Sequence, residues 1–200
     1  ARELQTRGYR VKLIAPQFVK PYVKSNKTDR NDAEAICEAM SRPSMRFVAI
    51  KSVEQQDIQA AHRIRSELIG QRTSKANQIR GLVGEYGLVA PQRLAQLRVA
   101  VPLWLEDAEN GLTSRFRRLL AGVWEDLKRL DERVAELDHE IKAIAEASPA
   151  AQRLQQLRGV GPVIATALVA ALGDGRAFSK GRDFARSEEH TSELQSLLII

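Results

Sequence analysis

The feature that most constrains the fold of this chain is a run of apolar residues whose spacing alternates strictly between four and three positions. This alternation gives the 3.5-residue period of a coiled coil, from which an ordinary amphipathic helix drifts away. It therefore predicts one long helix over residues 112–147, which pairs with a segment of the same chain or with another copy. The alternative is a long amphipathic helix that packs within its own domain. The run consists of Phe116, Leu120, Val123, Leu127, Leu130, Val134, Leu137, Ile141 and Ile144.

A second pattern, "SPAAQRLQQLRGVGPVIATALVAALGD", follows this helix. Ser148 as a cap and Pro149 at a first helical position predict a helix to residue 157, and a second helix runs from Pro162 to residue 172. The intervening Gly159, Val160 and Gly161 give the order of a helix-hairpin-helix motif. Glycines there let the backbone approach a phosphate, and the N–H groups that open the second helix can bind an anion. The alternative is an ordinary helical hairpin with glycine in its turn.

The first part of the chain predicts alternating strands and helices. Residues 9–15 ("YRVKLIA") and 45–50 ("MRFVAI") are rich in β-forming residues and predict two strands. Helices are expected over residues 29–40 and 53–80. Strand, helix, strand, helix is typical of an α/β sheet, so we expect a partial α/β domain followed by a mostly α part. The first of these helices has an apolar stripe that consists of Ala33, Ile36, Cys37 and Met40.

The charge of the chain is concentrated in this first part. Residues 1–80 contain 16 Lys and Arg against 8 Asp and Glu, whereas residues 112–147 contain 7 against 8. The surplus fits either a polyanionic partner or a merely solvated face. If there is such a partner, Lys24, Lys27 and Arg30 are its candidate contacts. The single cysteine, Cys37, excludes an internal disulfide framework and fits a reducing cytoplasm. No apolar run is long enough for a membrane-spanning helix.

Asp29 and Asp32 lie three residues apart at the start of the predicted helix 29–40. This spacing places both carboxylates on one side of the helix, with Cβ atoms about 5–6 Å apart. Two acids also suit the positive end of a helix dipole, so they can simply stabilise the first turn. They equally suit a Mg²⁺ site, because Mg²⁺ prefers a few carboxylate oxygens. Spacing alone favours the first interpretation, an acidic helix start, over the metal site.

Two stretches resemble a known family. The stretch "ARELQTRGYRVKLIAPQFVKPYVKSNKTDRNDAEAICEA" resembles the DEDD transposases of bacterial insertion sequences, and "RLQQLRGVGPVIATALVAALGDGRAFSKGRDFA" resembles the start of their C-terminal domain. The resemblance implies a RuvC-like nuclease domain, a coiled coil and a C-terminal transposase domain. It also implies a DNA recombinase that cuts and rejoins element ends with Mg²⁺, guided by a structured RNA. The heptad pattern adds the expectation of homo-oligomers formed through the coiled coil.

The same resemblance assigns roles to single residues. Asp29 and Asp32 match the third and fourth of the family's four metal-binding acids. The first Asp and the Glu are expected before residue 1, and neither Ser179 nor Ser187 matches the family's nucleophilic serine. We therefore expect an incomplete, inactive chain that lacks both true ends. The competing hypotheses are a non-catalytic nucleic-acid-binding protein and a coiled-coil scaffold.

These observations predict the organisation of the whole chain. The last segment, "RSEEHTSELQSLLII", is set apart because its first eleven residues match the translation of a common sequencing-library adapter, which predicts a non-biological end. The expected parts are residues 1–80 (nuclease domain), 81–111 (linker with short helices), 112–147 (coiled coil), 148–185 (start of the C-terminal domain with the hairpin) and 186–200 (adapter-derived).

Overall fold

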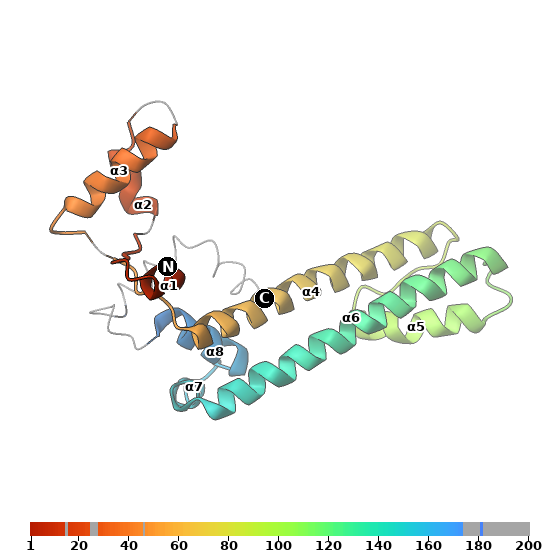
Figure 1. Ribbon diagram of the computed structural model, residues 1–200. Helices are drawn as coiled ribbons and strands as arrows, with labels where there is room; N and C mark the ends of the chain where they lie inside the picture. The colour runs from red at the N-terminus through yellow and green to blue at the C-terminus, as the bar shows by residue number, and fades with distance from the viewer. Residues whose placement is uncertain (15, 25–27, 46, 174–180, 182–200) are drawn as a thin grey trace. The chain divides into compact units, whose positions relative to one another are not determined.

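The computed structural model describes residues 1–14, 16–24, 28–45, 47–173 and 181, and these are mainly helical (Figure 1). The contacts between residues divide the chain into two compact units, Ala1–Asp57 with Val169–Ile200, and Ile58–Leu168. In chain order the elements are α1 (Arg2–Thr6), α2 (Pro16–Val19), the 3₁₀ turn η1 (Lys20–Tyr22), α3 (Asp29–Ser41), α4 (Val53–Gly84), α5 (Leu94–Glu106), α6 (Ser114–Ala147), α7 (Pro149–Gln155) and α8 (Pro162–Leu172).

The larger unit is built on two long helices, α4 and α6, which run antiparallel side by side (Figure 1). Ion pairs along the interface give the direction. Arg65 pairs with Asp138 at 2.5 Å, and Lys75, further along α4, pairs with Asp126, which comes earlier in α6, at 3.4 Å. The long helix predicted over residues 112–147 is confirmed. Within the described residues this helix lies against α4 of the same chain.

The heptad stripe of α6 is buried unevenly. Leu120, Leu127 and Ile141 are fully buried, and Val134 is 4% exposed. The alternate members of the stripe, Val123, Leu130, Leu137 and Ile144, are only half-buried. A single partner helix covers one side of a heptad seam better than the other, so this pattern follows from a two-helix pairing.

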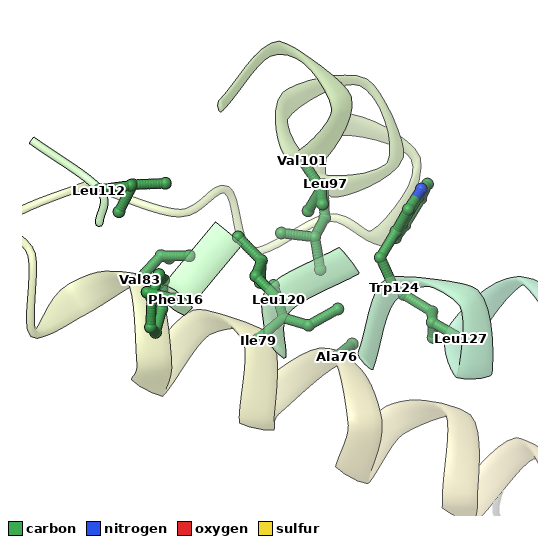
Figure 2. Packing of buried hydrophobic residues seen from close by; sticks show 10 residues of the cluster. All are labelled: Ala76, Ile79, Val83, Leu97, Val101, Leu112, Phe116, Leu120, Trp124 and Leu127. Atoms are coloured by element: carbon green, nitrogen blue, oxygen red, sulfur yellow. The ribbon is translucent and has the colours of Figure 1, made fainter. Parts of the chain in front are cut away.

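The hydrophobic core lies where α5 joins α4 and α6 (Figure 2). Fully burying one large apolar side chain stabilises the fold by about 1.5–3 kcal/mol, so this cluster is the main source of stability in the unit. Residues 81–111, predicted as a linker with short helical pieces, thus contain a 13-residue helix that contributes to the core. The cluster consists of Ala76, Ile79, Val83, Leu97, Val101, Leu112, Phe116, Leu120, Trp124 and Leu127.

The strands predicted at residues 9–15 and 45–50 do not form among the described residues, to which Ala15 and Arg46 do not belong. The two segments meet at a single antiparallel bridge, in which the Val48 N–H donates to the Leu13 carbonyl at 2.8 Å. The α/β class predicted for residues 1–80 is therefore not seen in the described part. Two short segments without further strands gain too little to hold a ladder, because an isolated pair is marginal in water.

Helix α3 packs against α2 and η1 in the smaller unit. The residues that it buries are Ala35 and Ala39, at 1% and 0% exposure. Its predicted apolar stripe lies elsewhere, since Ile36 and Met40 remain 46% and 42% exposed. Alanines allow close approach to short neighbouring helices, and the bulkier stripe lacks a cover among the described residues. None of the described helices is long and apolar enough to cross a bilayer.

Candidate functional site

The two predicted metal carboxylates lie in the first turn of α3. Thr28 caps this helix: its backbone is extended, and its Oγ1 accepts a hydrogen bond from the Asn31 N–H at 3.3 Å. Asp29 is the first helical residue and is exposed, and Asp32 is half-buried. Because one helical turn separates them, both carboxylates are presented on one side, near the helix N-terminus.

This pair fits part of a Mg²⁺ site. Mg²⁺ is commonly held by one or two carboxylates together with waters and substrate phosphates. Across the described residues, no group of three or more His, Cys, Asp or Glu gathers into a possible metal site. Asp29 and Asp32 can therefore supply two oxygen ligands, and any further ligands come from outside the described part of this chain.

The basic residues near the pair have different surroundings. Lys24 Nζ lies 2.6 Å from Glu34 Oε1 on an exposed surface. This hydrogen bond raises the pKa of Lys24 and lowers that of Glu34. Arg30 is exposed, and Lys27 lies outside the described residues. Sequence reasoning missed Glu34, whose charge compensates Lys24, because the two are ten residues apart and on different elements.

A turn joins α7 to α8 at the predicted glycines, although α7 ends at Gln155 and not at the predicted residue 157. Gly159 has φ of +89°, a left-handed conformation in which a side chain would be strained. The turn is closed by the Val160 N–H, which donates to the Leu157 carbonyl at 3.1 Å. Gly161 precedes α8, and its carbonyl accepts from the Ala165 N–H at 2.9 Å. The N–H groups of the first turn of α8 are left without partners within the helix, as at any helix start.

The predicted residues therefore fall into two groups in the two units. One helical turn brings Asp29 and Asp32 together in the first unit. Gly159, Val160 and Gly161 form one turn in the second unit, where Gly159 is exposed and the other two are half-buried. Ser179 and Ser187, neither of which matches the family's serine, and the adapter-like segment lie outside the described residues.

Both groups of residues lie in regions of the chain that match models of known protein families. A family model described as a transposase of the DEDD type of IS110 matches residues 2–87, and one for the IS116/IS110/IS902 transposase family matches residues 151–187. No solved structure matches the chain.

Three curated relatives match most of the chain. A probable family 20 transposase of Pseudomonas aeruginosa is 47% identical over 186 residues, which is 92% of this chain and 55% of the relative. The transposase of insertion sequence IS1111A from Coxiella burnetii is 46% identical over 89% of this chain and 49% of its own length. The transposase of IS1328 from Yersinia enterocolitica is 40% identical over 94% and 55%, respectively. The chain thus spans about half the length of these relatives. By these matches, the chain belongs to the IS116/IS110/IS902 family of insertion-sequence transposases.

Proposed function

We propose that this chain contributes metal-binding and DNA-binding residues to an insertion-sequence transposase, an enzyme that cuts and rejoins DNA at the ends of its element. One observation carries the proposal. The carboxylate pair lies within the region matched by the DEDD-type model, and the hairpin lies within the region matched by the second transposase model.

Asp29 and Asp32 are proposed as ligands of Mg²⁺, the third and fourth acids of the family's set. Bound Mg²⁺ would activate the attacking oxygen and stabilise the charge that develops on the phosphodiester. The protein's own contribution is positioning. Thr28 fixes the start of α3 through its bond to Asn31, so the two carboxylates keep a constant relation to each other.

The hairpin and the basic residues are proposed to hold the nucleic-acid backbone. Gly159, Val160 and Gly161 let the backbone of the turn come close to a phosphate, and the start of α8 supplies N–H donors. Arg30, Lys24 and Lys27 would add charge, Lys24 after releasing Glu34. A structured guide RNA as a second polyanionic partner, and action in the cytoplasm, are parts of the same proposal.

The parts of the chain are proposed to divide the work. Residues 1–80 belong to the nuclease domain, residues 112–147 form the coiled coil and support homo-oligomers, and residues 148–185 begin the C-terminal domain. The stretch 81–111 connects the first two, and residues 186–200 are proposed to derive from an adapter. Within the described residues, α4 already occupies the fully buried side of the α6 stripe, so a second copy would contact its half-buried side.

The catalytic proposal is tested with the open reading frame that contains this sequence. Asp29→Asn and Asp32→Asn should each abolish Mg²⁺-dependent cleavage of an element-end duplex and leave DNA binding unchanged. Glu38→Gln, at an exposed position on the same helix, is the control and should cleave normally. Full cleavage by both aspartate variants would rule out their role as metal ligands.

The 200-residue chain itself is proposed to be inactive in cleavage and strand transfer, because only two of the family's four acids match. The purified chain should leave an element-end duplex intact in the presence of Mg²⁺. Cleavage that depends on Mg²⁺ and is lost in Asp29→Ala would overturn this part of the proposal.

A non-catalytic nucleic-acid-binding protein is the second candidate. It is favoured by the complete hairpin in α7 and α8 beside an incomplete set of acids in the described residues. Both candidates predict that binding weakens steeply with salt, since each phosphate contact releases counterions. They differ in the effect of Asp29→Asn, which would leave every measured activity unchanged if the second candidate is right.

A further inference from the structure

Two buried polar side chains, His62 of α4 and Thr166 of α8, are joined in the larger unit. Each is only 1% exposed, and they are the buried polar side chains of the described ranges. His62 Nε2 lies 3.0 Å from Thr166 Oγ1, across 104 positions of sequence. Burying a polar group costs free energy unless it finds a partner, so the buried ring of His62 depends on Thr166.

The surrounding acceptors fix the direction of this hydrogen bond. Thr166 Oγ1 lies 2.8 Å from the Pro162 carbonyl and 3.2 Å from the Val163 carbonyl, and carbonyls only accept. The single hydroxyl hydrogen is therefore donated to a carbonyl of α8, and Oγ1 accepts from His62. His62 then carries its proton on Nε2, which leaves Nδ1 as a buried acceptor with no partner.

A neutral imidazole suits this site. Burial, together with the charge of Arg65 on the same helix, lowers the pKa of His62 to about 4. Protonation would add an N–H at Nδ1, where the structure provides no acceptor. At neutral pH the His62 ring is thus neutral and carries its proton on Nε2, so it always donates to Thr166.

We propose that the hydrogen bond between His62 and Thr166 is a latch that positions the start of α8, and with it the turn at residues 159–161, for contact with a nucleic-acid backbone. The path is short: His62 binds Thr166, and Thr166 binds the carbonyl of Pro162, the residue that follows the turn. The inference rests on the nucleic-acid binding proposed above. His62 and Thr166 are positioning residues, because neither is exposed to a ligand.

A buried hydrogen bond fixes the relative position of two helices more strictly than an apolar contact does. Apolar side chains tolerate sliding and rotation at small cost, whereas a hydrogen bond between buried groups is satisfied in a single relation of the two helices. The Thr166 hydroxyl keeps its carbonyl acceptors when His62 is removed, but removing Thr166 leaves the His62 N–H unsatisfied, which costs about 1–3 kcal/mol. Removing both with apolar groups of similar shape can be nearly neutral for stability. This difference separates positioning from a purely structural role.

The test uses the 200-residue chain and a mixed-sequence DNA duplex, with urea unfolding measured alongside affinity at low and high salt. Thr166→Val should lower the unfolding midpoint, because it leaves the His62 N–H unsatisfied. Thr166→Val and His62→Leu should each weaken duplex binding about tenfold, which corresponds to about 1.4 kcal/mol. The double variant should regain much of the lost stability and still bind weakly. Thr166→Ser keeps the hydroxyl and should bind like the parent chain.

A matched control is Thr73→Val on α4, where the exposed hydroxyl donates to the Ile69 carbonyl of its own helix at 2.9 Å. It should leave the affinity for the duplex unchanged. Recovery of binding together with stability in the double variant would show that the pair is structural only, and would overturn the latch. Unaltered binding by Thr166→Val would do the same. A parent chain that does not bind the duplex even at low salt would overturn the proposed binding, and the latch with it.

Discussion

Arg98 of α5 and Asp131 of α6 form a two-pronged pair in which Nε and Nη2 of the arginine donate to the two carboxylate oxygens at 2.8 and 2.7 Å. Such planar pairs are stronger and more specific than single contacts. The same carboxylate also accepts from Arg72 of α4 at 3.4 Å. Asp131 therefore links three helices, although it lies on a helix that the heptad pattern predicts to be held by apolar contacts.

Loss of this carboxylate should weaken the three-helix junction. Asp131→Asn keeps the shape but leaves two arginines without their anion, and Asp131 is only 20% exposed. We expect the free energy of unfolding to fall by about 1–3 kcal/mol, as for a partly buried network. Urea unfolding measures it. The control is Glu125→Gln, which removes an exposed pair with Lys128 and should change stability by less than about 0.5 kcal/mol. An Asp131→Asn variant as stable as the control would contradict the junction.

The sequence predicted α6 well and its partner poorly. The partner helix α4 also has a series of residues spaced alternately by four and three positions. Several members of this series are polar, so the hydrophobic pattern of α4 is incomplete. Arg65 and Arg72 lie at the interface because Asp138 and Asp131 of α6 receive them. A pattern of hydrophobic residues cannot predict such ion pairs between helices. The α4 series is Ile58, His62, Arg65, Ile69, Arg72, Ala76, Ile79 and Val83.

Only some parts of the candidate site could likewise be predicted from the sequence. Local signals predicted the carboxylate pair and the hairpin turn, because a cap and a left-handed glycine act within a few residues of each other. Long-range contacts such as His62 with Thr166 have no local signal, since each residue is ordinary in its own helix. The predicted strands depend on neighbours for their hydrogen bonds, and residues 9–15 and 45–50 meet in only one bridge among the described residues.

Arg117 should be irreplaceable by lysine. Its guanidinium donates to the carbonyls of Trp104 and Leu105 at 2.8 and 3.0 Å, where α5 ends, and also to Asn110 and Leu112 in the connection to α6. Lysine keeps the charge but cannot reach several acceptors at once. Arg117→Lys should lower the free energy of unfolding by about 1–3 kcal/mol. The neighbouring Arg118→Lys, at an exposed position, is the control. Equal stability of the two variants in urea would refute this role.

Stability should depend on pH through His62. Its pKa is about 4 in the folded chain against an ordinary 6.5, so the unfolded chain binds more protons between these values. The free energy of unfolding therefore falls as the pH is lowered from 6.5 to 4, by at most about 3 kcal/mol. Urea unfolding at pH 7 and pH 4.5 measures the loss. His62→Gln keeps a donor for Thr166 and cannot titrate, so its loss should be smaller. An identical loss in both chains would exclude His62 as the cause.

Replacing either of two glycines within α4 by alanine should stabilise the chain. Gly70 and Gly81 are exposed, and a Cβ at either would meet no atom within 4 Å. Gly70→Ala and Gly81→Ala should each raise the free energy of unfolding by about 0.5–1 kcal/mol, because alanine restricts the unfolded chain and favours helix. The contrasting variant is Gly159→Ala, which should be destabilised because φ is +89° there. Destabilisation by the two α4 substitutions, measured by thermal unfolding, would show that this helix face packs against something.

The two sides of the α6 stripe should behave differently when charged. Leu127 is fully buried in the core, so Leu127→Asp should unfold the pair of α4 and α6, seen as a loss of helical circular dichroism. Leu130 is half-buried, so Leu130→Asp should keep most of the helix content. If copies of the chain associate through this half-buried side, Leu130→Asp shifts the mass measured by sedimentation towards the monomer. Ala135→Asp places the same charge at an exposed position of α6 and should leave the mass unchanged. A folded Leu130→Asp variant with the parent's mass would remove the α6 stripe from any interface between copies, because a carboxylate there cannot be buried against a second chain without a partner.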